Sequence, residues 1–167
     1  MKIFRKIYYN IKYFIQRGKK GYSNFDLMDM DNYLLELIPN MLKDFKNRKD
    51  GFPMHLNENE WNNILDEIIS CFEKANPSTT DFVNPYKEDY YQNIVDPWYK
   101  KNFKPQIELV EENKQSYIKV LDMTIPEENQ KIKKLYDLKE EEKETYIQNN
   151  LENGFKLLVK YFNNLWY

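Results

Sequence analysis

Hydrophobic positions recur every three or four residues in several separate stretches of this chain, which is the spacing of one face of a helix. At about 100° per residue, the apolar side chains of residues 3–15 fall within an arc of roughly 140°. The arc consists of Ile3, Phe4, Ile7, Tyr8, Ile11, Phe14 and Ile15. Basic residues, together with Tyr9 and Tyr13, occupy the other side. The pattern predicts an amphipathic basic helix that ends near Gly18 and Gly21.

A second helix is predicted from about Asp31 to Arg48. Its expected core face consists of Tyr33, Leu34, Leu37, Ile38, Met41, Leu42 and Phe45. Pro39 falls on the opposite side of this helix, so we expect it to face solvent and to kink the helix away from the core. Gly51 and Pro53 then end the element.

A third helix is predicted to begin after Asn57. Asn57 is a preferred N-cap residue, and Glu60 stands three positions later, where a glutamate completes a capping box. The apolar residues that follow keep helical spacing: Trp61, Ile64, Leu65, Ile68 and Phe72. We expect this stripe to be buried.

Residues 76–105 interrupt the periodic pattern with four prolines among many aromatic residues. They predict a connecting segment with a short helix near 86–95. Residues 106–123 are ambiguous, because their apolar spacing suits a helix while Ile118 and Val120, beside a polar turn, suit a hairpin. Of the two, a helix is the preferred interpretation.

The C-terminal third is predicted to be helical again. Pro126, with two glutamates after it, marks the start of one helix, and a last helix is expected over about 139–166. Its predicted buried face is Ile147, Leu151, Phe155, Leu158, Val159, Phe162, Leu165 and Trp166.

These elements together predict an all-α fold. At 167 residues the chain suits one domain, and its four glycines and runs of Lys, Glu and Asn favour helices over a turn-rich β architecture. We expect a single compact domain over 1–167 with four to six helices, in which 1–20 is a basic amphipathic helix and 76–105 a Pro-rich, aromatic-rich connecting segment. No apolar stretch approaches the roughly 20 residues of a membrane span.

Charge is distributed unevenly along the chain. Seven of the 25 Lys and Arg residues lie in 1–20, which holds no acid, so the remaining 18 stand against 27 acids. An apolar stripe as wide as that of 1–20 must be covered, because large exposed apolar patches on soluble proteins are interaction sites. It therefore packs on its own body, pairs with a second copy in a homodimer, or lies on an anionic membrane surface. Packing on the body is the preferred interpretation.

Three acids, Asp26, Asp29 and Asp31, are crowded before the second helix. Ser23 and Asp26 have the spacing of a capping box, Asp31 suits the N-cap, and Asp29 suits the positive end of the helix dipole. The alternative is a divalent-cation cluster, but the stretch lacks the glycine and distal glutamate of an EF-hand loop. We expect helix capping, and no metal or other cofactor.

No catalytic constellation is recognisable in the sequence. His55 is the only histidine, and one histidine with one distant cysteine cannot form a zinc site. Cys71 stands beside Phe72 in a predicted helix and is interpreted as a small buried residue, not an activated thiolate. A single cysteine also fits a reducing compartment. We therefore do not expect an enzyme.

Three blocks of sequence carry a resemblance: GYSNFDLMDMDNYL, GFPMHLNENEWNNILDEI and GFKLLVKYFNNLWY. In this order they resemble a family of small uncharacterised proteins of tailed phages and prophages, whose pattern is G-Y-S/A-D-x-D-x-W-x-x-D-x-Y-L after a basic helix, then an E-x-W helix and a C-terminal K-Y-F-x-x-L-W helix. The blocks cover about half of the chain. Asn24 stands where the family has Asp, and Met28 where it has Trp.

The resemblance implies a phage accessory protein in the cytoplasm of the host, and it carries no known reaction. The leading hypothesis is non-catalytic binding of a host protein, for instance inhibition of a defence protein. The candidate contact residues that remain in the family block are Tyr22, Asp26, Asp29, Asp31 and Tyr33. Direct binding to nucleic acid is not expected of an acidic body.

The alternative hypothesis is sequestration of a nucleotide or cyclic-nucleotide signal. Such a site needs aromatic rings that stack on a base and cations that bind phosphate, and the connecting segment offers both. The candidates for this site are Tyr91, Trp98, Lys100 and Lys101. A metal-dependent hydrolase ranks behind both hypotheses.

Overall fold

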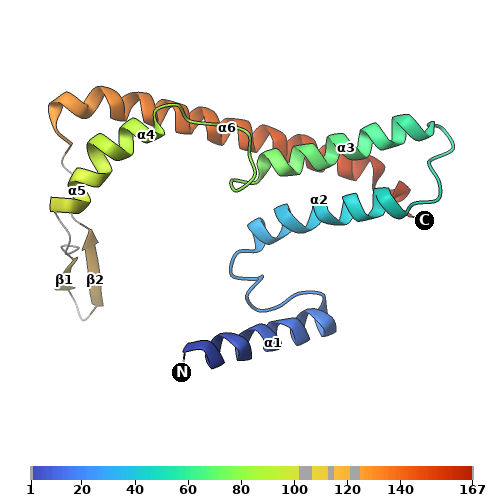
Figure 1. Cartoon of the computed structure of the whole chain (residues 1–167), viewed down its shortest axis with the longest axis horizontal. Helices are drawn as coiled ribbons and strands as arrows, with labels where there is room; N and C mark the ends of the chain where they lie inside the picture. Colours follow the sequence, from blue (N-terminus) through green and yellow to red (C-terminus); the bar gives the residue numbers. More distant parts are fainter. Residues whose placement is uncertain (1, 102–106, 113–114, 121–124, 167) are drawn as a thin grey trace. The chain divides into compact units, whose positions relative to one another are not determined.

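The computed structural model describes residues 2–101, 107–112, 115–120 and 125–166 (Figure 1). Helices dominate this part of the chain, so the predicted all-α class is confirmed. The α-helices are α1 (Lys2–Lys20), α2 (Met30–Arg48), α3 (Glu58–Ala75), α4 (Lys87–Tyr90), α5 (Asp96–Lys101) and α6 (Gln130–Tyr161). A π-helical turn, η1 (Tyr91–Val95), joins α4 to α5, and two 3-10 turns flank α6, η2 (Glu127–Asn129) and η3 (Phe162–Asn164). One antiparallel hairpin, β1 (Ile107–Glu112) and β2 (Gln115–Val120), completes the order.

The chain divides into two units by its internal contacts. The first unit consists of residues 1–81 and 146–167, and the second of residues 82–145. The helix α6 contributes its first half to the second unit and its second half to the first. The single-domain organisation expected over 1–167 stays a prediction.

The core of the first unit lies between α2, α3 and the last turns of α6. The predicted stripe of α3 is its centre, and Trp61, Leu65, Ile68 and Phe72 are fully buried. Two ring contacts connect α3 to α6, Trp61 with Tyr161 at 5.8 Å and Phe72 with Phe155 at 5.1 Å. The predicted capping box begins α3, because Asn57 and Glu60 exchange backbone–side-chain hydrogen bonds of 2.8 and 2.9 Å.

The buried face of α2 differs from the predicted one. Pro39 is buried together with Leu42, whereas Met41 is 61% exposed and Leu34 is also exposed. The face that packs on the core is rotated toward Leu35, Ile38, Leu42 and Phe45. The prediction that Pro39 faces solvent was wrong, because a proline that lacks an N–H donor loses nothing by burial and its ring supplies apolar surface.

The C-terminal helix is longer and buries fewer residues than expected. The helices predicted from Pro126 and from about residue 139 are continuous, since α6 begins at Gln130 after η2. Of the predicted buried face, four members are exposed: Phe155, Val159, Phe162 and Trp166. The side that packs on the core holds Leu151, Leu157, Leu158, Tyr161 and Leu165. Gly154 is buried on that side, beside Cys71 and Phe72, so α6 approaches α3 closely there and its other flank stays in solvent.

The second unit is organised around the buried Asn84. Its side-chain amide donates to the carbonyl of Tyr136 at 3.1 Å and to a carboxylate oxygen of Glu140 at 2.8 Å. Its side-chain oxygen accepts the N–H of Tyr86 at 3.0 Å, which starts the turn into α4. The rings of Tyr90 and Tyr136 stack face to face, with centroids 4.0 Å apart and planes 5° from parallel. The short helix predicted near 86–95 is confirmed as α4 and η1, and α5 continues it.

The preferred interpretation of 106–123 as a helix was wrong. Residues 107–112 and 115–120 form an antiparallel pair, in the register Ile107 to Val120 and Leu109 to Ile118. In this register the apolar residues 107, 109, 118 and 120 recur at every second position. Period-two spacing with β-branched residues favours a strand over a helix. Both strands are short, which made their helical and strand patterns hard to separate.

Candidate functional site

The turn that follows α1 holds the end of that helix. Gly21 adopts a left-handed backbone conformation (φ 81°), and its N–H donates to the carbonyl oxygen of Arg17 at 2.8 Å. Glycine enters this conformation without steric cost and is the usual residue where a helix ends in this way. The predicted end of the helix at Gly21 is confirmed, and Gly18 lies within the last turn of α1.

Ser23 and Asp26 form the predicted capping box in the next turn. The N–H of Ser23 donates to a carboxylate oxygen of Asp26 at 2.7 Å, and the N–H of Asp26 lies 3.4 Å from the Ser23 hydroxyl oxygen. Both residues are buried, and Asp26 is only 4% exposed. A buried carboxylate is costly unless it is paired and hydrogen-bonded, so this turn needs a cation.

Arg17 supplies that cation from the last turn of α1. Its Nε donates to one carboxylate oxygen of Asp26 at 2.9 Å, and its Nη2 donates to the other oxygen. These hydrogen bonds, assisted by that from Ser23 and opposed by burial, lower the pKa of Asp26 to about 2. The same pairing raises the pKa of Arg17. At neutral pH the pair is therefore fully ionised, and its bidentate geometry fixes both distance and orientation.

Other contacts tie the same turn to the polar side of α1. The N–H of Asn24 donates to the side-chain oxygen of Gln16 at 2.9 Å, and the ring of Phe25 lies 5.6 Å from that of Tyr13. With 3.6 residues per turn, Tyr13, Gln16 and Arg17 lie within an arc of roughly 100° that is opposite the apolar stripe. We call these contacts, with the Arg17–Asp26 pair, the clasp. The clasp therefore holds α1 through its polar side.

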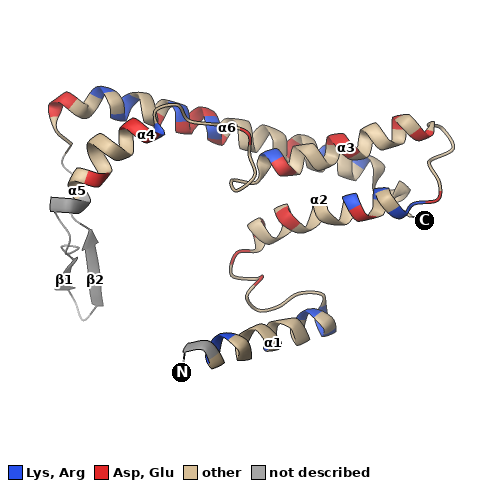
Figure 2. Ribbon diagram, in the orientation of Figure 1, with Lys and Arg blue, Asp and Glu red and all other residues tan. Residues whose placement is uncertain are grey.

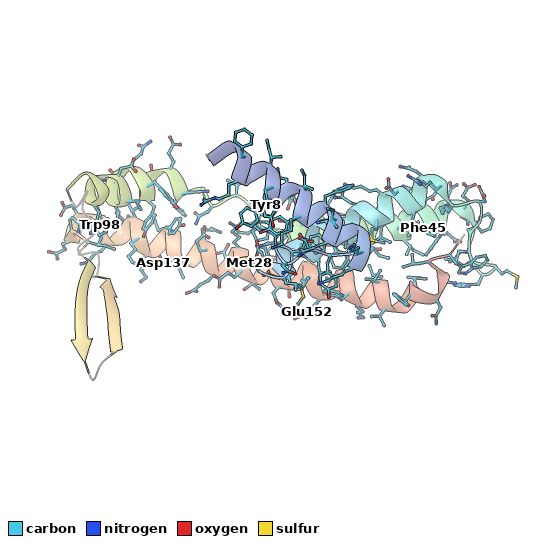
Figure 3. All side chains as sticks on the ribbon, turned by 90° about the horizontal axis from the view of Figure 1, so that it is seen from below. Tyr8, Met28, Phe45, Trp98, Asp137 and Glu152 are labelled. Atoms are coloured by element: carbon cyan, nitrogen blue, oxygen red, sulfur yellow. The ribbon has the colours of Figure 1, made fainter. Side chains whose placement is uncertain are left out.

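The apolar stripe of α1 is exposed. Its phenylalanines are the most exposed members, Phe4 at 79% and Phe14 at 77%. The remaining described members are also classed as exposed: Ile7, Tyr8, Ile11 and Ile15. Tyr8 is labelled on α1 in Figure 3. Within the first unit, these exposures show that the stripe is not covered by the body, as the preferred expectation required, because the clasp holds α1 by its polar side.

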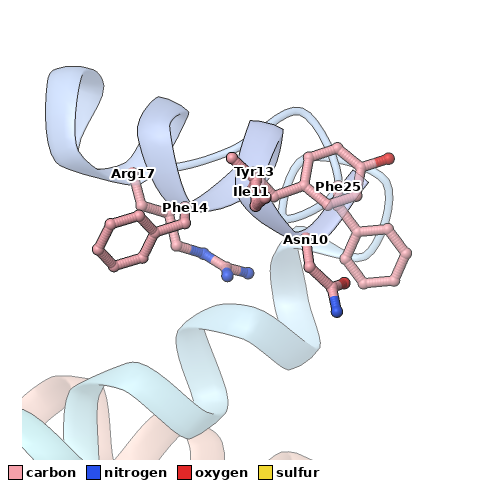
Figure 4. Close-up of a pocket in the computed structure, with 6 residues that line it drawn as sticks. All are labelled: Asn10, Ile11, Tyr13, Phe14, Arg17 and Phe25. Carbon is pink, nitrogen blue, oxygen red and sulfur yellow. The ribbon is translucent and has the colours of Figure 1, made fainter. Parts of the chain in front are cut away.

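The rest of α1 carries basic residues among Tyr9, Asn10, Tyr13 and Gln16, and the described part of this helix holds no acidic residue (Figure 2). Beside the stripe, a shallow groove runs along α1 between Phe14 and Phe25, where Asn10, Ile11, Tyr13 and Arg17 complete its lining (Figure 4). The groove joins an apolar wall to the Arg17 guanidinium. The surface formed by the stripe, the basic residues and this groove is the candidate site.

The structure places the predicted contact residues of the family block in two groups. Asp26 belongs to the clasp, and the hydroxyl of Tyr33 lies 3.5 Å from the carbonyl oxygen of Gly21 beside it. Tyr22, Asp29 and Asp31 are exposed. Asp31 was predicted at the N-cap of this helix and Asp29 in its first turn. The structure has the reverse, because α2 begins at Met30 with Asp29 at the N-cap and Asp31 in the first turn. The side chain of Asp29 accepts from Asn32 at 2.8 Å instead of capping the backbone.

The predicted nucleotide-binding residues all lie in the second unit. Tyr91 is exposed and makes a T-shaped contact with Tyr90, which stacks on Tyr136. Trp98 is half-buried in α5 (Figure 3). The side chains of Lys100 and Lys101 lie outside the described residues. A nucleotide site requires an aromatic ring with a cation beside it. The nucleotide-binding hypothesis stays a prediction.

Metal-binding and thiol chemistry find no support among the described residues. No group of three or more His, Cys, Asp or Glu side chains in that part of the chain could hold a metal ion. His55 is exposed in a turn. Burial raises the pKa of the Cys71 thiol, which disfavours the reactive thiolate. Among the described helices, none is sufficiently long and apolar to cross a membrane.

Comparison with protein-family models, with curated proteins and with solved structures finds no match to this chain. The resemblance to phage proteins stays a prediction from the sequence blocks.

Sequence reasoning missed the residues of α1 that make the clasp, above all Arg17 and Gln16. One signal was available for Arg17. A capping-box aspartate in an aromatic-rich turn is a candidate for burial. A buried carboxylate needs a cationic partner, and residues close in the sequence are the first candidates. Arg17 stands four residues before Gly21, where the chain leaves α1 and turns toward Asp26. Nothing in the sequence indicated the groove beside Phe25.

Proposed function

We propose that this protein acts by non-catalytic binding of a host component, and that α1 is its binding element. The single observation that carries the proposal is the exposed apolar stripe of α1, on which Phe4 and Phe14 stand almost fully in solvent. An exposed apolar face of this kind on a soluble chain is the usual mark of an interaction surface. The setting in an infected bacterium comes from the phage resemblance alone.

The clasp supports the proposal in a second way. A binding helix costs less free energy to dock when its orientation is already fixed, because fewer degrees of freedom are lost on binding. The bidentate pair of Arg17 with Asp26 and the Gln16–Asn24 hydrogen bond hold the end of α1 before any partner arrives. They do so from its polar side, so binding through the stripe does not require these contacts to break.

The test uses the full chain with a C-terminal tag in a bacterial extract that is separated into membranes and soluble proteins. Wild-type protein is expected to associate with one of the two fractions, and Phe4→Asp/Phe14→Asp is expected to lose at least about 90% of that association, a tenfold change or roughly 1.4 kcal/mol. The matched control is Val159→Asp/Phe162→Asp, which places the same charges at exposed apolar positions near the C-terminus.

Both double variants should keep the melting temperature within a few degrees, because substitutions at exposed sites usually change stability by about 0.5 kcal/mol or less. An association that survives Phe4→Asp/Phe14→Asp unchanged would overturn the proposal, and so would an association that both double variants abolish equally.

A further inference from the structure

We infer that the component bound by α1 is an anionic lipid surface, in whose headgroup plane the helix lies. This inference rests on the proposed function and names the partner class of the same element. It starts from three properties of α1: an exposed apolar stripe, a surround of cations without acids, and attachment to the rest of the chain by the polar side. The first two properties are those of helices that lie in a membrane interface, and the third leaves the apolar stripe accessible to one.

Lysines border one edge of the stripe. At about 100° per residue, Lys19 and Lys12 lie about 20° and 40° beyond Tyr8 on that edge, whereas Asn10 and the paired Arg17 border the other edge and separate Lys6 from Phe14. Long basic side chains in these positions can extend their apolar stems along the membrane surface while the charges reach the phosphates. Tyr8, exposed at the edge of the stripe, has the amphipathic ring that prefers the interface.

The clasp and the charge distribution agree on orientation. Tyr13, Gln16 and Arg17 hold the turn on the side opposite the stripe, so the stripe can enter the headgroup region while the turn stays on the aqueous side. Outside residues 1–20 the chain carries 18 basic against 27 acidic residues. An anionic surface attracts α1 and repels this acidic remainder, which favours contact through α1 alone.

The charge of α1 also favours a lipid surface over a second copy or a protein as the partner of the apolar stripe. Two copies that pair through their stripes would bring together two helices with seven cations each and no acids. A protein partner would need a groove that is apolar along its floor and acidic on the rim beside Lys12 and Lys19. Anionic phospholipid supplies an apolar interior and phosphate charges in this arrangement along the whole of α1.

The experiment is co-sedimentation of the full chain with vesicles of phosphatidylcholine that contain about one third phosphatidylglycerol, compared with pure phosphatidylcholine. The anionic vesicles are expected to bind at least tenfold more tightly. Raising the salt from about 0.1 M to about 1 M shortens the Debye length from about 10 Å to about 3 Å and should weaken the binding by a similar factor.

Two pairs of variants separate the apolar and the electrostatic contribution. Phe4→Asp/Phe14→Asp and Lys12→Glu/Lys19→Glu should each reduce binding to anionic vesicles by at least tenfold. The matched control Lys131→Glu/Lys134→Glu changes the net charge by the same amount at exposed positions of α6 and should leave binding within about twofold.

Failure of this inference is distinguishable from failure of the proposed function. Absence of binding to anionic vesicles, with an association in bacterial extract that still depends on Phe4 and Phe14, overturns the lipid inference and leaves α1 as the binding element for a protein. A dimer that Phe4→Asp/Phe14→Asp converts to a monomer, without any vesicle binding, overturns it in favour of a second copy. No dependence on α1 in either experiment overturns both.

Discussion

The guanidinium of Arg17 and the carboxylate of Asp26 form a bidentate ion pair that joins the last turn of α1 to the turn before α2. Asp26 is buried and Arg17 half-exposed, so the aspartate depends on this partner more than the arginine does. The pair makes α1 an oriented extension of the chain. Because Arg17 is used in this way, its guanidinium is not free to bind phosphate.

Asp26→Asn is expected to lower stability at neutral pH, and the difference from wild type should depend on pH. The pKa of Asp26 is lowered from its ordinary value of 3.8 to about 2 in the folded chain. A depressed carboxylate contributes stability that is present above the unfolded pKa and is lost as pH falls through the folded one. Melting temperatures measured between about pH 6 and about pH 2 should therefore converge as pH falls.

The control for this experiment is Asp31→Asn, at an exposed position of the first turn of α2. Its melting temperature should stay near that of wild type. A gap between wild type and Asp26→Asn that is the same at every pH would mean that the variant acts by packing and not through the ion pair.

Asn57→Ala should destabilise the first unit by about 0.5–2 kcal/mol, because it removes the oxygen that accepts the N–H of Glu60 at 2.9 Å. Urea unfolding measures the loss. The matched control is Asn63→Ala, which removes the same side chain from an exposed position within α3 and should be neutral or slightly stabilising. Equal effects of the two substitutions would contradict a capping role.

Local chemistry in the sequence predicted helix ends better than buried faces. The caps at Gly21 and Asn57 depend on a few adjacent residues, and the structure has both. The buried sides of α2 and α6 depend on which neighbours reach them. Pro39 is buried and Val159 is exposed because the core covers one narrow side of each helix, which no periodic pattern specifies. The hairpin of 107–112 with 115–120 was recognised only as the alternative to a helix, because six-residue strands give a weak signal.

The candidate site was predictable only in part. The amphipathic character of 1–20 followed from spacing, and so did the capping pair of Ser23 and Asp26. The spacing did not predict which side of α1 the turn holds, because that side depends on contacts of Arg17 and Gln16 with residues eight or nine positions away. That choice of side decides whether the stripe is buried or exposed.

Gly154→Val should lower stability by about 1–3 kcal/mol, as overpacking of a core does. A side-chain Cβ at this position would lie 3.2 Å from the Cβ of Cys71 and 3.3 Å from a ring carbon of Phe72. For a chain of this length, each kcal/mol corresponds to roughly 2–4 °C in melting temperature. Gly18→Ala is the control, because Gly18 is helical with open space around it. It should leave the melting temperature unchanged or slightly higher, and an equal loss in both variants would contradict a close approach of α6 to α3.

The stack of Tyr90 on Tyr136 should be measurable as a coupling within the second unit. A double-mutant cycle with Tyr90→Leu and Tyr136→Leu is expected to give a coupling energy of about 0.5–1.5 kcal/mol, the usual range for aromatic pairs. Tyr91→Leu serves as the control, because Tyr91 meets Tyr90 only edge to face at 5.9 Å and is exposed. Its coupling to Tyr136 should be smaller than that of Tyr90, whose ring stacks on Tyr136.

The same pair has a pH dependence at the alkaline end. Burial raises the pKa of Tyr136, with the Glu140 carboxylate adding to the effect. A phenol whose pKa is raised by folding contributes stability that is present below its ordinary pKa of 10.0 and is lost as pH rises through the folded value. Tyr136→Phe keeps the stacked ring without the ionisable group, so its unfolding midpoint should fall less than that of wild type between about pH 9 and about pH 11. Parallel losses in the two proteins would show that Tyr136 ionises as freely in the folded chain as in the unfolded one, and that the stack does not shield its hydroxyl.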